Sequence, residues 1–255
     1  MQHCLLLLFS RRKLLYEDGS ENAVPAGGIM SVVPSLSYDP GLAPLAVRAA
    51  LVWGLDLPKC TATASTPAYV SEILARVRAA GEGFLSAERK SAVRNMLRFG
   101  SYKPAGRSKP SSEYLLAAAL EGSFPLVNGP VDANNAVSLE SGYPASIFDL
   151  ELCGANLLLR RGLPGESYVF NPSGQIIDLK DLLCVCRAEG ESWLPCGNPV
   201  KDAMATKTRE STRSVAAVIY APVSEPRAAL DAAAERFASL LRTECGSEET
   251  GWTLP

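Results

Sequence analysis

The chain has 255 residues, of which 47% are hydrophobic and 20% charged, and this composition is typical of a globular protein with a sizeable core. The formal net charge is -2, so any contact with nucleic acid requires a local basic surface. No apolar run approaches the length of a membrane span, and seven irregularly spaced cysteines favour reduced thiols in the cytoplasm over a secreted disulfide framework.

The first residues differ in character from the rest. Residues 4–9 are apolar but too short for a signal peptide, and their basic residues (11–13) follow instead of preceding them. Residues 10–29 are polar and rich in glycine. We expect residues 1–29 to be a disordered extension, or translation to begin at Met30, which intact mass of the native protein would decide. Residues 30–245 are expected to form a single domain, and residues 246–255 a tail.

The first half of the domain is mainly helical. Residues 45–57 mix β-branched and aromatic residues and predict a strand, and residues 67–97 predict two helices broken near Gly81. Residues 101–110 form a loop, after which Ser111 or Ser112 can cap a helix that runs to Glu121. A loop at 122–130 then leads to a short helix at 131–141, which ends at Gly142.

The second half is richer in strands. Strands are predicted at 157–161, 166–171, 175–179 and 182–186, and the apolar run 215–220 predicts a buried strand. Residues 226–244 have apolar residues at helical spacing and predict an amphipathic helix. We therefore predict an α+β fold with a mixed or antiparallel sheet and flanking helices.

A basic stretch spans residues 88–110, where seven cations face one acid. Such a concentration in an acidic chain favours contact with nucleic acid, with Phe99 and Tyr102 available for stacking; the alternative is a solvated helix face and loop. We predict contacts to RNA phosphates from Arg94, Arg98, Lys103, Arg107 and Lys109.

A run of polar residues follows at 132–140. If the segment is helical, Asn134 and Ser138 share a face, and with Asn135 they could bind a carbonyl, an amine or a ribose hydroxyl without burying a charge. The alternative is helix capping by Asp132 and surface asparagines.

Further along, a Cys196-Gly197 turn precedes a hydroxyl-rich segment that contains Thr206 and Thr212. Backbone N–H groups at a glycine turn can bind an amino-acid carbonyl or an oxyanion. The alternative is a loop whose threonines satisfy local backbone groups.

Two kinds of chemistry are disfavoured. The single histidine, His3, lies in the expected extension, which excludes a Ser-His or Cys-His pair within the domain. Cys184 and Cys186 point the same way on a strand, but no C-x-x-C pair or nearby histidine accompanies them, so buried structural thiols are favoured over a zinc site. We expect no metal and no cofactor.

The spacing V-D-x-x-N-x-x-x-L-E-x-G-x-P-x-x-x-F-D over residues 131–149 resembles the B3/B4 editing domain of the bacterial phenylalanyl-tRNA synthetase β subunit. A looser match follows, in which Cys196-Gly197, Thr212 and Val215 stand for a glycine turn, a threonine and a buried strand. The resemblance covers roughly residues 101–222. The residues that match the main motif are Val131, Asp132, Asn135, Leu139, Glu140, Gly142, Pro144, Phe148 and Asp149.

The family domain hydrolyses tyrosine wrongly attached to the phenylalanine tRNA, in a cleft for the amino acid and the terminal adenosine. The resemblance implies a free-standing B3/B4-like protein that acts in trans on released aminoacyl-tRNA. It implies catalytic roles for Asn135, Glu140 and Ser146. The substrate-binding residues would be Asn134, Ser138, Gly142, Cys196, Gly197, Thr206 and Thr212.

Two positions depart from the family pattern. Ser146 stands where the family has an editing histidine, and Val218 stands near the place of a glutamate that recognises the tyrosine hydroxyl. Both changes imply a different amino-acid specificity. A positioned water with oxyanion stabilisation can suffice for an activated ester, with Glu140 or Asp149 as acidic helpers. The alternatives are a non-catalytic module that binds RNA or a free amino acid, and a protein–protein adaptor of the same fold.

Overall fold

The computed structural model describes residues 32–42 and 46–255. The extension expected at residues 1–29 and the alternative start at Met30 lie outside the described residues. The described residues form two four-stranded sheets, a two-stranded hairpin and a group of helices. This arrangement confirms the predicted α+β class. The sequence predicted one sheet built mainly from the second half of the chain, whereas strands from both halves build two.

The first sheet has the order β10-β2-β9-β3 and is antiparallel throughout. Its strands are β10 (Glu249–Thr253), β2 (Val47–Leu55), β9 (Val215–Pro222) and β3 (Ala145–Asp149). Every residue of β9 and of β3 is buried. The continuous apolar run of β9 is typical of a strand that is covered on both faces.

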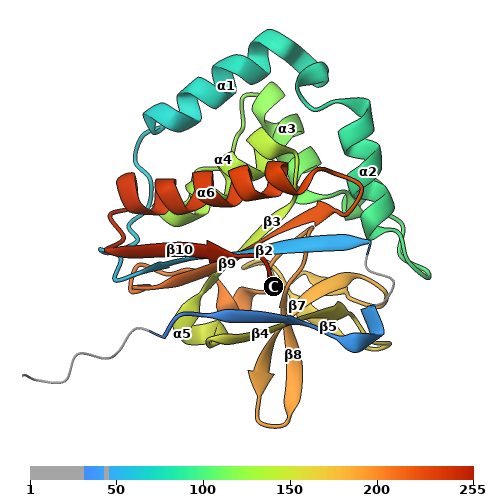
Figure 1. Ribbon diagram of the computed structural model, residues 1–255. Coiled ribbons are helices and arrows are strands. Elements are labelled where there is room, and N and C mark those ends of the chain that lie inside the picture. The colour runs from blue at the N-terminus through green and yellow to red at the C-terminus, as the bar shows by residue number, and fades with distance from the viewer. Residues whose placement is uncertain (1–31, 43–45) are drawn as a thin grey trace, which may run out of the picture. The chain divides into compact units, whose positions relative to one another are not determined.

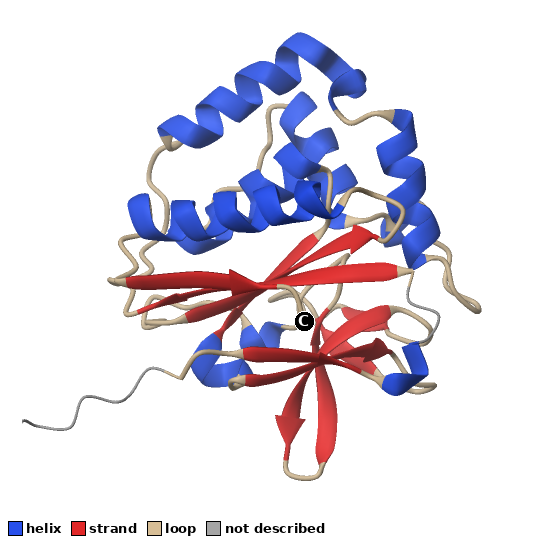
Figure 2. Ribbon diagram, in the orientation of Figure 1, coloured by secondary structure: helices blue, strands red, loops and turns tan. Residues whose placement is uncertain are grey.

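Helices cover one face of this sheet (Figures 1 and 2). They are α1 (Ala68–Ala80), α2 (Ala87–Leu97), α3 (Ser111–Leu120), α4 (Gly129–Ser141) and α6 (Arg227–Thr243), and a 3-10 turn at Gly81–Phe84 separates α1 from α2. The helix α6 packs on β2, and α4 packs on α6, α3 and β3. None of the helices in the described part of the chain has an apolar stretch long enough for a membrane span.

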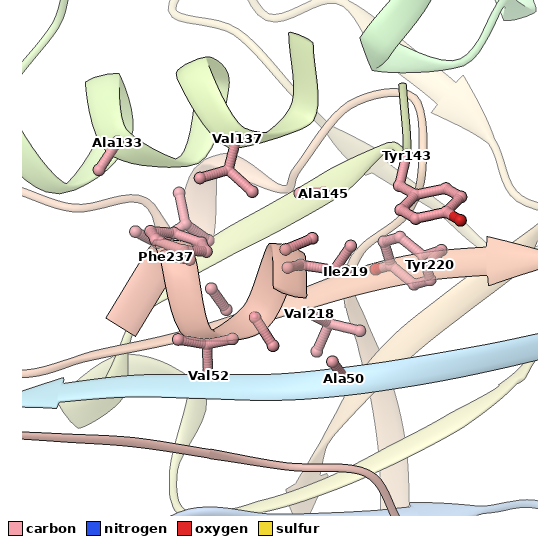
Figure 3. Close-up of a cluster of buried hydrophobic side chains, with 14 of the residues drawn as sticks. Ala50, Val52, Ala133, Val137, Tyr143, Ala145, Val218, Ile219, Tyr220 and Phe237 are labelled. Atoms are coloured by element: carbon pink, nitrogen blue, oxygen red, sulfur yellow. The ribbon is translucent and has the colours of Figure 1, made fainter. Parts of the chain in front are cut away.

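The core lies between the helices and the sheet. Val137 of α4 and Phe237 of α6 point toward Val52 and Val218 of the sheet (Figure 3), and all four are at most 1% exposed. The helical spacing of apolar residues on α6 brings them onto one face, as predicted from its sequence. Burial of side chains of this size stabilises the fold by roughly 1.5–3 kcal/mol each, so α4 is held firmly against the sheet.

The second sheet covers the other face of the first (Figure 2). Its order is β1-β4-β7-β8, with β1 and β4 parallel and the other pairs antiparallel. A short hairpin of β5 and β6 and the short helix α5 complete the fold. The bounds are β1 (Ser35–Tyr38), β4 (Asn156–Arg161), β7 (Leu183–Glu189), β8 (Ser192–Gly197), β5 (Ser167–Val169), β6 (Ile176–Asp178) and α5 (Leu150–Cys153).

Several local expectations need correction. The strands β1, β3, β8 and β10 were not predicted, and β10 places residues 249–253 of the expected tail at the edge of the first sheet. Neither Ser111 nor Ser112 caps α3, because Pro110 occupies the N-cap position without a side-chain hydrogen bond. Cys184 and Cys186 lie on β7 as free, buried thiols, and burial raises the pKa of Cys186 to about 12.

The helix α4, which carries the polar run, has well-defined ends. The side chain of Asn128 caps its first turn by accepting a hydrogen bond from the Val131 N–H, and Pro130 occupies the first turn. Gly142 ends the helix with a left-handed φ of 75°, a conformation that costs glycine little. Because both ends of α4 are fixed, the direction in which Asn134 and Asn135 project from the helix is fixed as well.

Candidate functional site

A cavity of about 270 Å³ opens between α3, α4, β3 and the segment that follows β8. Its polar side chains come from α3, the middle of α4 and residues 198–208, and its apolar side chains come mainly from α3, α4, β3 and the loop before α4. The lining residues are Ser111, Tyr114, Leu115, Pro125, Val127, Val131, Asn134, Asn135, Ala145, Ile147, Asn198, Val200, Lys201, Asp202, Lys207 and Thr208.

Two asparagines from α4 line this cavity. Asn134 is only 4% exposed, and its Nδ2 donates to the Oδ1 of Asn135 over 3.4 Å. The Oδ1 of Asn134 is buried and has no hydrogen-bond partner within the described residues. A buried acceptor without a partner costs free energy, so this oxygen is available to a donor on a ligand.

An acidic residue, Asp202, also lines the cavity, from the segment after β8. Its Oδ2 accepts a hydrogen bond of 3.2 Å from the Ile147 N–H of β3. Its Oδ1 is buried and, among the residues at 32–42 and 46–255, finds no hydrogen-bond donor. The cavity thus contains a second unpartnered acceptor beside the one on Asn134.

The Asp202 carboxyl has a strongly altered acidity. Burial raises its pKa from the ordinary value of 3.8 to about 7, because desolvation penalises the charged form. The hydrogen bond from the Ile147 N–H and the charge of Lys207 oppose the rise without cancelling it. A carboxyl with a pKa near 7 exchanges protons readily at neutral pH, which suits a general base or acid.

Two lysines stand on the same wall as Asp202, held by the aromatic residue that follows β5. The Nζ of Lys201 lies 3.8 Å from the centre of the Phe170 ring, and the Nζ of Lys207 donates to the Phe170 carbonyl over 2.7 Å. Burial lowers the pKa of Lys207, while Asp202 acts in the opposite direction. The wall therefore combines one carboxyl with two amines.

Ser146 is hydrogen-bonded to the backbone of the segment that carries Asp202. It is fully buried on β3, and its hydroxyl lies 3.1 Å from the Asn198 carbonyl, to which it donates, and 3.0 Å from the Tyr220 hydroxyl. The Asn198 side chain accepts hydrogen bonds from the N–H groups of Val200 and Lys201, at 2.8 and 2.9 Å. Ser146 therefore holds the backbone that carries Asp202 and does not line the cavity.

Glu140 and Gly142 lie away from the cavity. Glu140 forms ion pairs with Arg76 and Arg236, which place it on the side of α4 that faces α1 and α6. Gly142 is the C-cap of α4. These positions do not support a catalytic role for Glu140 or a binding role for Gly142 at this cavity.

The predicted hydroxyl residues have structural partners. Ser138 donates to the Tyr143 carbonyl over 2.8 Å, and Thr206 donates to the Cys196 carbonyl over 3.2 Å. Thr212 donates to Oδ2 of Asp149 over 2.6 Å. Asp149 also caps α5 by accepting from the Glu151 N–H, so its contacts are structural. These contacts satisfy the fold and leave none of the three hydroxyl groups lining the cavity.

The Cys196-Gly197 turn forms the end of β8 and lies behind Asp202. The Cys196 thiol donates to the Val185 carbonyl over 3.4 Å, so it is part of the sheet. A Cβ on Gly197 would collide with the Phe148 ring and lie 2.6 Å from Oδ1 of Asp202. The absence of a side chain at Gly197 therefore allows close packing against the Asp202 carboxyl. The sequence predicted a contact between Gly197 and the substrate, but Gly197 is not among the residues that line the cavity.

The predicted basic residues divide into paired and unpaired groups. Arg94 on α2 forms a bidentate ion pair with Glu113 of α3, which neutralises its charge. Arg98 is exposed and donates to the Asn95 side chain over 2.9 Å.

Lys103, Arg107 and Lys109 are exposed on the loop that leads to α3. The backbone after this loop is anchored where the Ser111 N–H donates to the Pro199 carbonyl over 2.8 Å, at the wall of the cavity. Lys109 therefore stands close to the cavity, because it is only two residues from Ser111.

Asp202, Lys201 and Lys207 were not predicted as site residues. They lie in a segment without helical or strand periodicity, which follows Pro199 and includes Thr206 and Thr208. A turn signal at Gly197-Asn198-Pro199 marks the segment as a loop. The sequence contains no sign that this loop is buried, because its burial depends on β3, which is about 55 residues away along the chain.

No protein-family model matches the chain. Among solved structures, the chain is similar to the crystal structure of an N-terminal fragment of the phenylalanyl-tRNA synthetase beta subunit from Pyrococcus horikoshii. The two are 10% identical, the TM-score is 0.44, and the match covers 87% of this chain and 51% of that chain. The chain thus matches only about half of that fragment, and a similarity this distant does not by itself assign a function.

Proposed function

We propose that this protein hydrolyses the ester of an aminoacyl-tRNA in trans, with the cavity beside α4 as the aminoacyl site. The observation that carries the proposal is the pair of buried, unpartnered acceptors, Oδ1 of Asn134 and Oδ1 of Asp202, on two residues that line one cavity. Unsatisfied buried acceptors are uncommon in folded proteins and are explained when a ligand supplies donors.

The polarity of the cavity suits an α-ammonium group. An ammonium carries three donors and no acceptor, which complements acceptor oxygens on two walls. The ionised form of Asp202 adds a charge-assisted hydrogen bond, which is stronger than a neutral one. The cavity of about 270 Å³ is slightly smaller than the usual small-molecule site, which fits an amino acid and leaves a nucleotide outside.

Asp202 is the proposed general base. Its carboxylate takes a proton from a water molecule as the water oxygen attacks the ester carbonyl carbon. The bond between that carbon and the ribose oxygen then breaks, and the ribose oxygen receives the proton. The products are the free amino acid and uncharged tRNA. An ester of this kind is already activated, and the neighbouring ribose hydroxyl assists the attack of the water molecule.

Asn135 is the proposed partner of the carbonyl oxygen. Its Oδ1 accepts from Asn134, so its Nδ2 is left to donate toward the cavity. A donor placed where negative charge develops stabilises the transition state, and loss of one such donor costs about 10²–10³ in rate. This role retains the prediction made for Asn135 from the sequence.

The exposed basic loop is the proposed tRNA contact. Lys103, Arg107 and Lys109 are exposed on it, and Lys109 lies near the cavity wall at Ser111. Phosphate contacts of this kind supply affinity that falls steeply with salt. Arg94 is a matched control because its ion pair with Glu113 removes its free charge, and we expect Arg94→Ala to leave the salt dependence of binding unchanged.

The motif at residues 131–149 gives independent support. It resembles the editing domain named above, and two of its residues, Val131 and Asn135, line the cavity. Ser146, at the position of the family histidine, lies under the wall that carries Asp202. Asp202 would then supply the proton-accepting group in this protein.

Binding of a free amino acid without hydrolysis is the second candidate. Lys201 and Lys207 line the cavity together with the two acceptors, so the site offers partners for both a carboxylate and an ammonium. An aminoacyl ester has no free carboxylate, whereas a free amino acid has one. The hydrolysis assay separates the two candidates.

The test is ester loss from a panel of correctly and wrongly charged tRNAs, corrected for loss without protein. We expect selective loss of one or a few species, abolished in Asp202→Asn and reduced about a hundredfold in Asn135→Ala, with tRNA binding retained. Asp231→Asn on α6 changes an aspartate outside the cavity lining and serves as the matched control. Equal rates in Asp202→Asn and the unaltered protein would refute the proposal.

A further inference from the structure

The cavity is divided into a polar and an apolar side. Among the described residues that line it, the charged side chains are Lys201, Asp202 and Lys207, and all three belong to the segment after β8. Ser111 lies beside that segment, because its N–H donates to the Pro199 carbonyl over 2.8 Å. Its Oγ is buried and, in the described part of the chain, is a third polar atom of the cavity lining without a partner.

The apolar side is built by other elements. Leu115 comes from α3, Val131 from the first turn of α4, Pro125 and Val127 from the loop before α4, and Ala145 and Ile147 from β3. Leu115, Ala145 and Ile147 are at most 6% exposed. None of these side chains offers a hydrogen-bond donor or acceptor to a ligand, whereas Tyr114 of α3, which also lines the cavity, carries a hydroxyl.

The geometry points to an aliphatic amino acid as the ligand of this cavity, an inference that rests on the proposed function and specifies its substrate. The α-ammonium takes the acceptors of Asn134 and Asp202, and the side chain then lies against Leu115 and Val131. Val131 is one helical turn from Asn134 on α4, so the two project from the same side of the helix. One helix thus contacts both parts of the ligand.

Polar side chains are rejected by the same wall. A charged group placed against Leu115 and Val131 would lose its water and find no partner in these two apolar side chains. Discrimination by one methylene in an apolar pocket is about 10- to 200-fold. We therefore expect leucine- or methionine-like side chains to bind at least about tenfold more tightly than glutamate- or lysine-like ones.

The test uses amino-acid amides, which keep the ammonium group, lack a free carboxylate and contain no ester. Titration calorimetry with the full chain compares the L-amides of glycine, alanine, leucine, methionine, tyrosine, lysine and glutamate. We expect leucinamide and methioninamide to bind most tightly. Equal binding of glycinamide and leucinamide, tightest binding of a charged amide or tyrosinamide, or no binding of any amide at millimolar concentration would overturn the inference.

Two substitutions at Val131 test the placement of the side chain. Val131 is only partly buried, so α4 can accept a change there. Val131→Phe fills the apolar side, and we expect it to weaken leucinamide binding at least about tenfold while alaninamide changes little. Val131→Ala enlarges the space and should shift the preference toward larger amides. An unchanged profile in the folded variants, checked by thermal melting, would overturn the placement.

Failure of the inference and failure of the proposed function give different results. If esters are hydrolysed at equal rates whatever the side chain, the function holds and the aliphatic preference is wrong. If no ester is hydrolysed but the amides bind with the expected preference, the cavity is an aliphatic amino-acid site and the hydrolytic proposal is wrong.

Discussion

Replacement of Asp202 by asparagine is expected to stabilise the protein at neutral and alkaline pH while it abolishes hydrolysis. The carboxyl packs against Gly197 and leaves Oδ1 without a donor from the described residues. Asparagine keeps the shape of the side chain and carries no charge at any pH. The substitution therefore separates the cost of ionising a buried carboxyl from the cost of losing its packing.

The magnitude follows from the altered acidity of Asp202. Burial raises the pKa of this carboxyl in the folded state from 3.8 to about 7, so the folded protein binds more protons than the unfolded chain between these values. The stability contributed by the protonated form is complete below pH 3.8 and is lost as the pH rises through about 7. The loss above pH 7 amounts to roughly 4 kcal/mol as an upper limit.

The assay is the free energy of unfolding in urea, measured from pH 4 to pH 8 for the unaltered protein and Asp202→Asn. We expect the two to agree near pH 4 and the variant to be more stable at pH 8 by at least about 1 kcal/mol, or about 2–4 °C in melting temperature. A difference that does not change with pH would refute the assigned acidity of Asp202. A variant that is less stable at every pH would refute the claim that Oδ1 lacks a partner.

Three further outcomes are expected. Gly197→Ala places a Cβ against the Phe148 ring and the Asp202 carboxyl; it should cost about 1–3 kcal/mol in urea unfolding and lower hydrolysis, and full retention of both would contradict the packing. Asp132→Ala removes the acceptor of the Val127 N–H and should destabilise the protein by about 1–3 kcal/mol, measured by thermal melting, whereas an unchanged melting temperature would remove its role in holding that loop. The double substitution of Arg107 and Lys109 by alanine should weaken tRNA binding and reduce its salt slope by about two phosphate contacts in a filter-binding titration, and an unchanged slope would place the tRNA elsewhere.

The elements that the sequence predicted correctly carry strong local signals. The helix α4 has an asparagine cap, a proline in its first turn and a glycine end, and β9 is a continuous apolar run. The missed strands lack such signals. The sequence of β3 mixes apolar residues with a serine and an aspartate without strict alternation, and β8 contains a proline near its end. The pairing of strands into two sheets depends on contacts between distant segments, which local patterns do not encode.

The candidate site was predictable only where one helix carries it. Asn134 and Asn135 are neighbours on α4, and the polar run in the sequence is sufficient to identify them. Glu140 lies six residues beyond Asn134, which is not a whole number of helical turns, and it therefore faces Arg76 and Arg236 instead. The pKa of Asp202 is raised only when β3 packs against it, so the residues next to it in the sequence do not indicate its role.

The measurement that tests the central claim most directly is the rate of ester loss from aminoacyl-tRNA with the unaltered protein and with Asp202→Asn, as a function of pH. After subtraction of the loss without protein, we expect kcat/KM of the unaltered protein, which reports the unliganded site, to rise as the pH passes about 7 and then level off, because the carboxylate is the active form. Asp202→Asn should bind tRNA equally well and show no rate above background. A variant that hydrolyses the same substrates with the same pH profile would contradict the assignment of this cavity as the site of hydrolysis.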